Sequence, residues 1–91
     1  MAVKLISYDL GIPEASTSYR ELISYIESLG DSIRPLKSFF LVDTMQSCKS
    51  IRDGALKLLD RNDRFIVMEV DLGIWATYGL PNSVLEWMHK H

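Results

Sequence analysis

Three short segments of the chain are almost continuously apolar and predict buried strands. Residues 3–10, 38–42 and 65–70 are rich in aromatic and β-branched side chains and present apolar residues on both faces. The two faces of the first segment consist of Val3, Leu5 and Ser7, and of Ile6, Tyr8 and Leu10. A weaker strand at 33–36 contains Pro35, which cannot donate a hydrogen bond to a sheet, so an edge position is expected for it.

Apolar residues at helical spacing predict helices between these strands. The first helix carries Tyr19, Leu22, Ile23, Ile26 and Leu29 on one stripe. It is expected to start at a capping box of Ser18 and Glu21, and to end at Gly30 in the left-handed conformation. A second helix is predicted over 47–59, with Gly54 as a weak point. A second capping box, Ser83 with Glu86, predicts a short helix near the C-terminal end.

The order strand, helix, strand, strand, helix, strand is typical of a ferredoxin-like α+β sandwich. We interpret residues 1–91 as one domain, with a core over 1–72 and a C-terminal tail over 73–91. In this fold two helices cover one face of an antiparallel sheet, yet the strands are apolar on both faces. The second face therefore needs a cover, either the tail or a second copy of the chain, and we expect a homodimer that uses both.

The composition excludes some classes of protein and partner. A net charge of −2 and a pI of about 5.6 give no general attraction to nucleic acid, so such binding would have to be local. No apolar run reaches the roughly 20 residues that a membrane span needs, and the start of the chain lacks the pattern of a secretory signal. The single cysteine, Cys48, fits a reducing compartment and a packing role. A cytoplasmic location away from membranes is expected.

Asp9 is the main candidate for chemistry, because a carboxylate is unusual at the end of an apolar strand. In the predicted topology it lies near Lys37, Ser38, Asp63 and Arg64, while Asp43 and Asp71 fall at the opposite end of the sheet. One carboxylate is a poor site for a divalent ion, but two Asp9 side chains meeting across a dimer axis could share Mg²⁺ or Mn²⁺. The plainer alternative is that Asp9 accepts hydrogen bonds from loop amides.

Other polar and aromatic residues have both a functional and a structural interpretation. Ser38 is a candidate catalytic residue beside Asp9, and the candidate substrate-binding residues are Tyr8, Lys37 and Arg64. Trp75 and Trp87 fit a core or interface better than a base-stacking platform. His89 and His91 are interpreted as a frayed, solvated end that could capture a metal ion.

Several segments together resemble a family, namely Ile6–Leu10, Ser38–Val42, Ile51–Asp53, Leu59–Asp63 and Val70–Trp75. The chain resembles the SinR-like family of small bacterial and phage proteins, which is similar to the CRISPR-associated protein Cas-two and to virulence-associated protein D. This resemblance implies a ferredoxin-like homodimer, with Asp9 at the dimer axis and implicated in metal-dependent cleavage of RNA or DNA, and with Ser38 and Phe39 opening the third strand. Cas-two proteins usually carry a basic run after the aspartate, whereas residues 11–17 here are neutral to acidic.

Two hypotheses of function follow. The first is a Cas-two-like, metal-dependent endonuclease with Asp9 from both copies at its centre. The second is a non-catalytic dimeric module that binds a protein partner in a host or phage defence or toxin system. A third interpretation, a small toxin, would differ from the endonuclease hypothesis in its neighbouring gene rather than in its chemistry.

Overall fold

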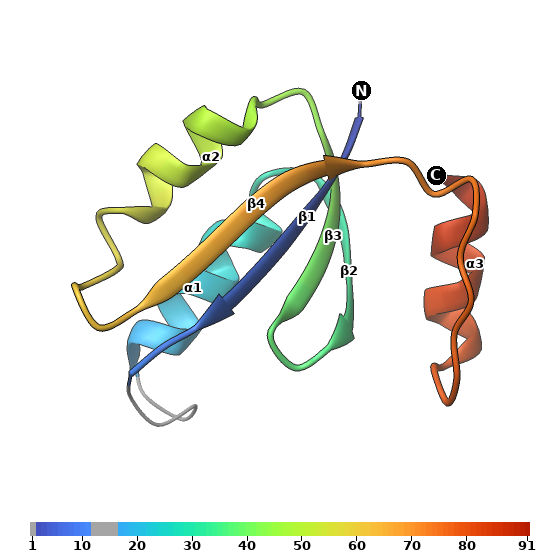
Figure 1. Cartoon of the computed structure of the whole chain (residues 1–91), viewed down its shortest axis with the longest axis horizontal. Coiled ribbons are helices and arrows are strands. Elements are labelled where there is room, and N and C mark those ends of the chain that lie inside the picture. The colour runs from blue at the N-terminus through green and yellow to red at the C-terminus, as the bar shows by residue number, and fades with distance from the viewer. Residues whose placement is uncertain (1, 12–16) are drawn as a thin grey trace.

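The computed structural model describes residues 2–11 and 17–91. Within these ranges the chain forms four strands and three helices in the order β1 (Ala2–Asp9), α1 (Thr17–Glu27), β2 (Asp31–Leu36), β3 (Phe39–Thr44), α2 (Cys48–Ala55), β4 (Arg64–Val70) and α3 (Asn82–Lys90). The strands form one antiparallel sheet in the order β2-β3-β1-β4. The helices α1 and α2 lie on one side of the sheet and α3 lies on the other (Figure 1). This is the ferredoxin-like α+β fold that the sequence predicts, with β2 at an edge as expected.

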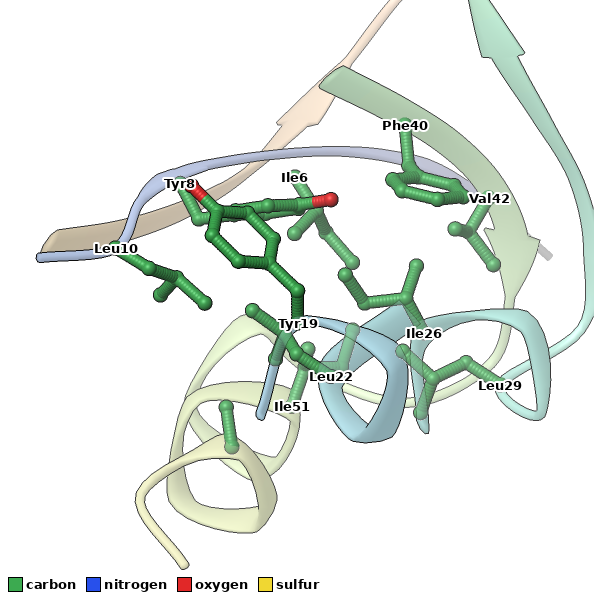
Figure 2. Close-up of a cluster of buried hydrophobic side chains, with 11 residues drawn as sticks. Ile6, Tyr8, Leu10, Tyr19, Leu22, Ile26, Leu29, Phe40, Val42 and Ile51 are labelled. Carbon is green, nitrogen blue, oxygen red and sulfur yellow. The ribbon is translucent and has the colours of Figure 1, made fainter. Parts of the chain in front are cut away.

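The main core lies between the sheet and the pair α1 and α2 (Figure 2). Alternate residues of β1 and β3 point into it, and the stripe of α1 that the sequence predicts packs against them. Its largest fully buried side chains are Phe40, Ile6, Leu22, Ile26, Ile51 and Val42. Burial of this apolar surface is the dominant favourable contribution to folding.

The second face of the sheet is covered by α3, the helix of the tail. Its buried side chains Val84, Trp87 and Met88 pack with Val3 and Leu41 in a separate core cluster. The expectation that the tail covers this face is confirmed. The cover is partial, because on β4 Ile66 and Met68 remain 49% and 42% exposed. The homodimer stays a prediction.

The tail is fastened by a polar cluster around Asp31 at the start of β2. The Trp87 indole N–H donates to Asp31 Oδ1 at 3.0 Å, and His91 Nε2 lies 3.0 Å from Asp31 Oδ2. The His91 ring stacks on the Trp87 ring at 3.8 Å between centroids. The interpretation of His91 as a frayed, solvated residue was therefore wrong. The stacked ring and the shared carboxylate hold it against the sheet.

We expect the attachment of α3 to weaken in acid. The hydrogen bond from Trp87, and then the nearby His91, hold the pKa of the Asp31 carboxyl below its ordinary value of 3.8. A lowered pKa stabilises the folded state above the ordinary value, and this contribution is lost as the pH falls through the folded-state pKa. Amide-exchange protection of α3, followed from about pH 6 down to 2, should therefore decline before that of Phe40 in the main core.

The variant Asp31→Asn should abolish this selective acid response. Asp53→Asn is the matched control, because the pKa of Asp53 is also lowered, by hydrogen bonds from Lys49 and Arg52, but Asp53 lies on α2. If α3 responds to acid in Asp31→Asn as it does in the unaltered chain, the Asp31 carboxyl is not the cause of that response.

Two glycines allow close packing rather than unusual backbone conformations. Gly30 was predicted to be left-handed, yet among the described residues Gly79 is the one glycine with a positive φ. A Cβ at Gly30 would lie 2.2 Å from the carbonyl oxygen of Asp43. A Cβ at Gly54 would lie 2.1 Å from the Tyr25 hydroxyl, which donates to the Ile51 carbonyl at 2.8 Å. Gly54 thus lets α1 and α2 approach each other.

Helix ends differ from the sequence prediction. The helix α2 ends at Ala55 rather than at residue 59, and turns follow it. The helix α3 begins after an extended Pro81 without a side-chain cap, so Ser83 lies inside its first turn and the predicted capping box is wrong. The capping box predicted at Ser18 involves a side chain outside the described residues.

Candidate functional site

Asp9 is the last residue of β1 and is exposed. It pairs in register with Arg64, the first residue of β4. Because side chains alternate along a strand, Asp9 belongs to the same face as Leu5 and Ser7, which is the face that α3 covers in part. The carboxylate therefore stands at the end of the open part of that face.

A shallow depression of about 250 Å³ surrounds this position and is lined in part by Ser7, Asp9, Arg64 and Ile66. In the part of the chain that the structure describes, no hydrogen bond or ion pair engages the Asp9 carboxylate. The plainer interpretation, in which Asp9 accepts hydrogen bonds from loop amides, concerns mainly residues 12–16, which lie outside the described ranges. The carboxylate is accessible to a ligand from solvent.

The turn between β2 and β3 brings Ser38 and Lys37 to the same end of the sheet. The Ser38 carbonyl accepts a hydrogen bond from the amide of Tyr8, next to Asp9, at 3.2 Å. The Lys37 carbonyl accepts from the Arg34 guanidinium, with Nε at 2.7 Å, and the Lys37 side chain is exposed. Asp43 pairs with Val3 at the other end of the sheet. The predicted grouping of Ser38, Lys37 and Arg64 at the strand end of Asp9 is confirmed.

Tyr8 lies on the opposite face from Asp9. Its side chain is 5% exposed and packs beside the rings of Tyr19 and Phe40, with centroids 5.9 and 6.4 Å away (Figure 2). A ring in the main core cannot stack on a substrate at the open face. The candidate substrate-binding role of Tyr8 is therefore replaced by a packing role.

The described residues provide no ready-made metal centre. Among residues 2–11 and 17–91, no group of three or more His, Cys, Asp or Glu side chains is arranged to hold a metal ion. Asp63, the other acid in the predicted grouping, uses both carboxylate oxygens on backbone amides, those of Gly11 at 3.0 Å and of Asp60 at 2.9 Å. Asp9 offers a hard oxygen ligand of the kind Mg²⁺ and Mn²⁺ prefer, and further ligands would come from water or another molecule.

Sequence reasoning missed Ser7 and Ile66, which line the same depression as Asp9. Ser7 and Ile66 are paired across β1 and β4, and their side chains lie on the same face of the sheet as that of Asp9. The signal was available, because strand alternation together with the predicted strand order places residues 7 and 66 side by side.

None of the helices in the described ranges combines the length and the apolar character required to cross a membrane.

Comparisons with known proteins define the fold and leave the activity open. No protein-family model matches the chain, and no curated protein matches it significantly. Among solved structures, the chain is similar to the crystal structure of a hypothetical protein, TT1823, from Thermus thermophilus. The two are 21% identical with a TM-score of 0.68, over 88% of this chain and 94% of that one. Likeness at this level of identity shows a shared fold, and a shared fold does not carry function with it.

Proposed function

We propose that the chain acts as a homodimeric, metal-dependent endonuclease that hydrolyses phosphodiester bonds of RNA or DNA, as its resemblance to Cas-two proteins implies. The observation that supports this most directly is the exposed Asp9 carboxylate, which stands at a strand end beside an open apolar surface. A second copy packed on the surface around Ile66 and Met68 would bring a second Asp9 to the same place.

Each residue of the site has a role in this proposal. The two Asp9 carboxylates hold Mg²⁺ or Mn²⁺, an ion that acts as a Lewis acid toward water and phosphate. Arg64, paired with Asp9 across the strands, binds a phosphate oxygen of the substrate. Lys37 adds a second positive charge, and the Ser38 hydroxyl donates to phosphate or orients water.

The charge distribution makes the proposed binding local. With a net charge of −2, the chain as a whole does not attract a phosphate backbone, so the contacts of Arg64 and Lys37 must supply the attraction. Few phosphate contacts imply weak binding. A cytoplasmic location, where nucleic acid and divalent ions are both present, belongs to the same proposal.

Replacing Asp9 by asparagine tests the proposal. Asp9→Asn keeps the size of the side chain but removes the charge that holds the ion, so cleavage of labelled RNA or DNA with Mg²⁺ or Mn²⁺ should fall to the level seen without metal. Asp71→Asn is the matched control. Asp71 is exposed beyond β4 at the other end of the sheet, and its contact with the Gly73 amide survives the change. Sedimentation should show dimers for both variants.

Three results would each contradict the proposal. These are full cleavage by Asp9→Asn, no cleavage by the unaltered chain with either ion, and a chain that remains monomeric at the concentrations that cleave.

A second candidate function is a binding module without catalysis. It is favoured by a hollow of about 410 Å³ between the tail and the sheet, which is lined mainly by apolar side chains such as Leu5, Phe39 and Trp75. In the loop between β4 and α3, Ile74 and Tyr78 are each 98% exposed, which is unusual for large apolar side chains. The Asp9 experiment separates the candidates, because a binding module requires that the unaltered chain cleaves nothing.

A further inference from the structure

The short turn between α2 and β4 is tied to the chain where it leaves β1. The turn closes on itself, since the Asp63 amide donates to the Asp60 carbonyl at 3.1 Å and the Asn62 amide donates to Asp60 Oδ1 at 2.8 Å. This is the turn chemistry typical of aspartate and asparagine. Gly11, two residues beyond Asp9, lies against it.

The Asp63 carboxylate bridges the two segments. Its Oδ1 accepts from the Gly11 amide at 3.0 Å, and its Oδ2 accepts from the Asp60 amide at 2.9 Å. Hydrogen bonds to an ionised carboxylate are stronger than those between neutral groups. A single side chain therefore fixes the exit of β1 to the entry of β4.

The backbones also approach closely at this point. A Cβ placed on Gly11 would lie 3.1 Å from the Asn62 Cβ and 3.4 Å from the Asn62 carbonyl oxygen. Glycine lets the chain leaving β1 rest directly on the turn, which brings the Gly11 amide within reach of Asp63.

We propose that Asp63 is a positioning residue for Asp9. Asp9 ends β1, and its cross-strand partner Arg64 follows Asp63 directly. The Asp63 carboxylate thus holds both strands of this pair at their ends. A strand end without such a tie frays, and its terminal side chain samples many directions. The role in metal binding rests on the proposed function of Asp9, whereas the restraint on the strand end does not.

Asp63→Asn breaks the bridge with little change in shape. The Gly11 and Asp60 amides bond to different oxygens of Asp63, so in asparagine one of them would face an NH2 group and the other would lose a charged acceptor. Asp60→Asn is the matched control. It removes the same charge from the same turn but keeps the oxygen that accepts from Asn62. The amide exchange of Phe40, in the main core, reports any general loss of stability.

Three NMR measurements test the proposal. In Asp63→Asn, exchange of the Gly11 amide should rise about tenfold or more, the expected effect of losing a charged hydrogen bond. The carboxyl resonance of Asp9 should move toward that of an aspartate in an unfolded peptide. The Mn²⁺ concentration that half-broadens the Asp9 amide should rise about tenfold or more, as for loss of an outer-shell partner. Asp60→Asn should leave all three close to the unaltered chain.

The outcomes separate the two proposals. An unchanged Gly11 exchange rate or Asp9 carboxyl resonance in Asp63→Asn, or equal effects in Asp60→Asn, would overturn the positioning role. If the unaltered chain shows no Mn²⁺ broadening at Asp9, the metal-dependent function fails, while the first two measurements still decide the role of Asp63.

Discussion

Replacing Trp87 by alanine is expected to lower the free energy of unfolding by about 3–5 kcal/mol, as for other large-to-small changes at buried aromatic residues. The ring is buried, stacks on His91 and donates its N–H to Asp31. Its loss should detach α3 and expose Val3 and Leu41 to water. Urea unfolding followed by circular dichroism measures the loss, and binding of a hydrophobic dye reports the exposed face.

Trp87→Phe is the control for this experiment. Phenylalanine keeps an aromatic ring but cannot donate to Asp31, so the loss should be about 1 kcal/mol plus a small packing cost. An alanine variant that is no less stable than the phenylalanine variant would show that the ring contributes little to holding the tail.

Lys4 and Glu69 form an ion pair, and removing the charge of Glu69 should lower the free energy of unfolding more than removing the charge of Lys4. Lys4 is 4% exposed and its Nζ lies 3.3 Å from Glu69 Oε1, whereas Glu69 is largely in solvent. Glu69→Gln leaves a buried ammonium group without its counter-ion. Breaking a fully buried pair costs about 3–5 kcal/mol, and because water reaches Glu69 we expect about 2 kcal/mol or more here.

Lys4→Met should be nearly neutral or stabilising, since it replaces the buried charge with an apolar chain of similar length and leaves an exposed Glu69 that water can solvate. Urea unfolding of both variants at neutral pH checks the contrast. A methionine variant less stable than the glutamine variant would mean that Lys4 has partners in the folded state that outweigh the cost of its burial.

The topology and the grouping at the site were predictable because both follow from strand order. Once β1, β3 and β4 are recognised as strands of a ferredoxin-like sheet, Asp9 and Arg64 must lie at the same end. Alternation along β1 also places the side chains of Tyr8 and Ser7 on opposite faces of the sheet. It could not decide which face the helices cover, because both faces are apolar, and so the buried position of Tyr8 was missed.

Contacts between residues far apart in the sequence could not be predicted. Asp31 and His91 are 60 positions apart, and nothing local to either indicates that they meet. Gly30 has the local sequence of a helix end, yet the oxygen that excludes a side chain there belongs to Asp43, a distant residue on β3. Turn chemistry indicated the turn at 60–63, but local sequence does not determine where the carboxylate of Asp63 points.

Both tryptophans of the chain lie in the tail, where Trp75 is 5.0 Å from the ring of His89 and Trp87 stacks on His91. Tyr8, Tyr19 and Tyr25 lie on the other side of the sheet. Indole emission therefore reports the C-terminal layer, whereas three of the four phenol rings lie on the side of α1 and α2. Detachment of the C-terminal layer can therefore be followed by intrinsic fluorescence without an added label.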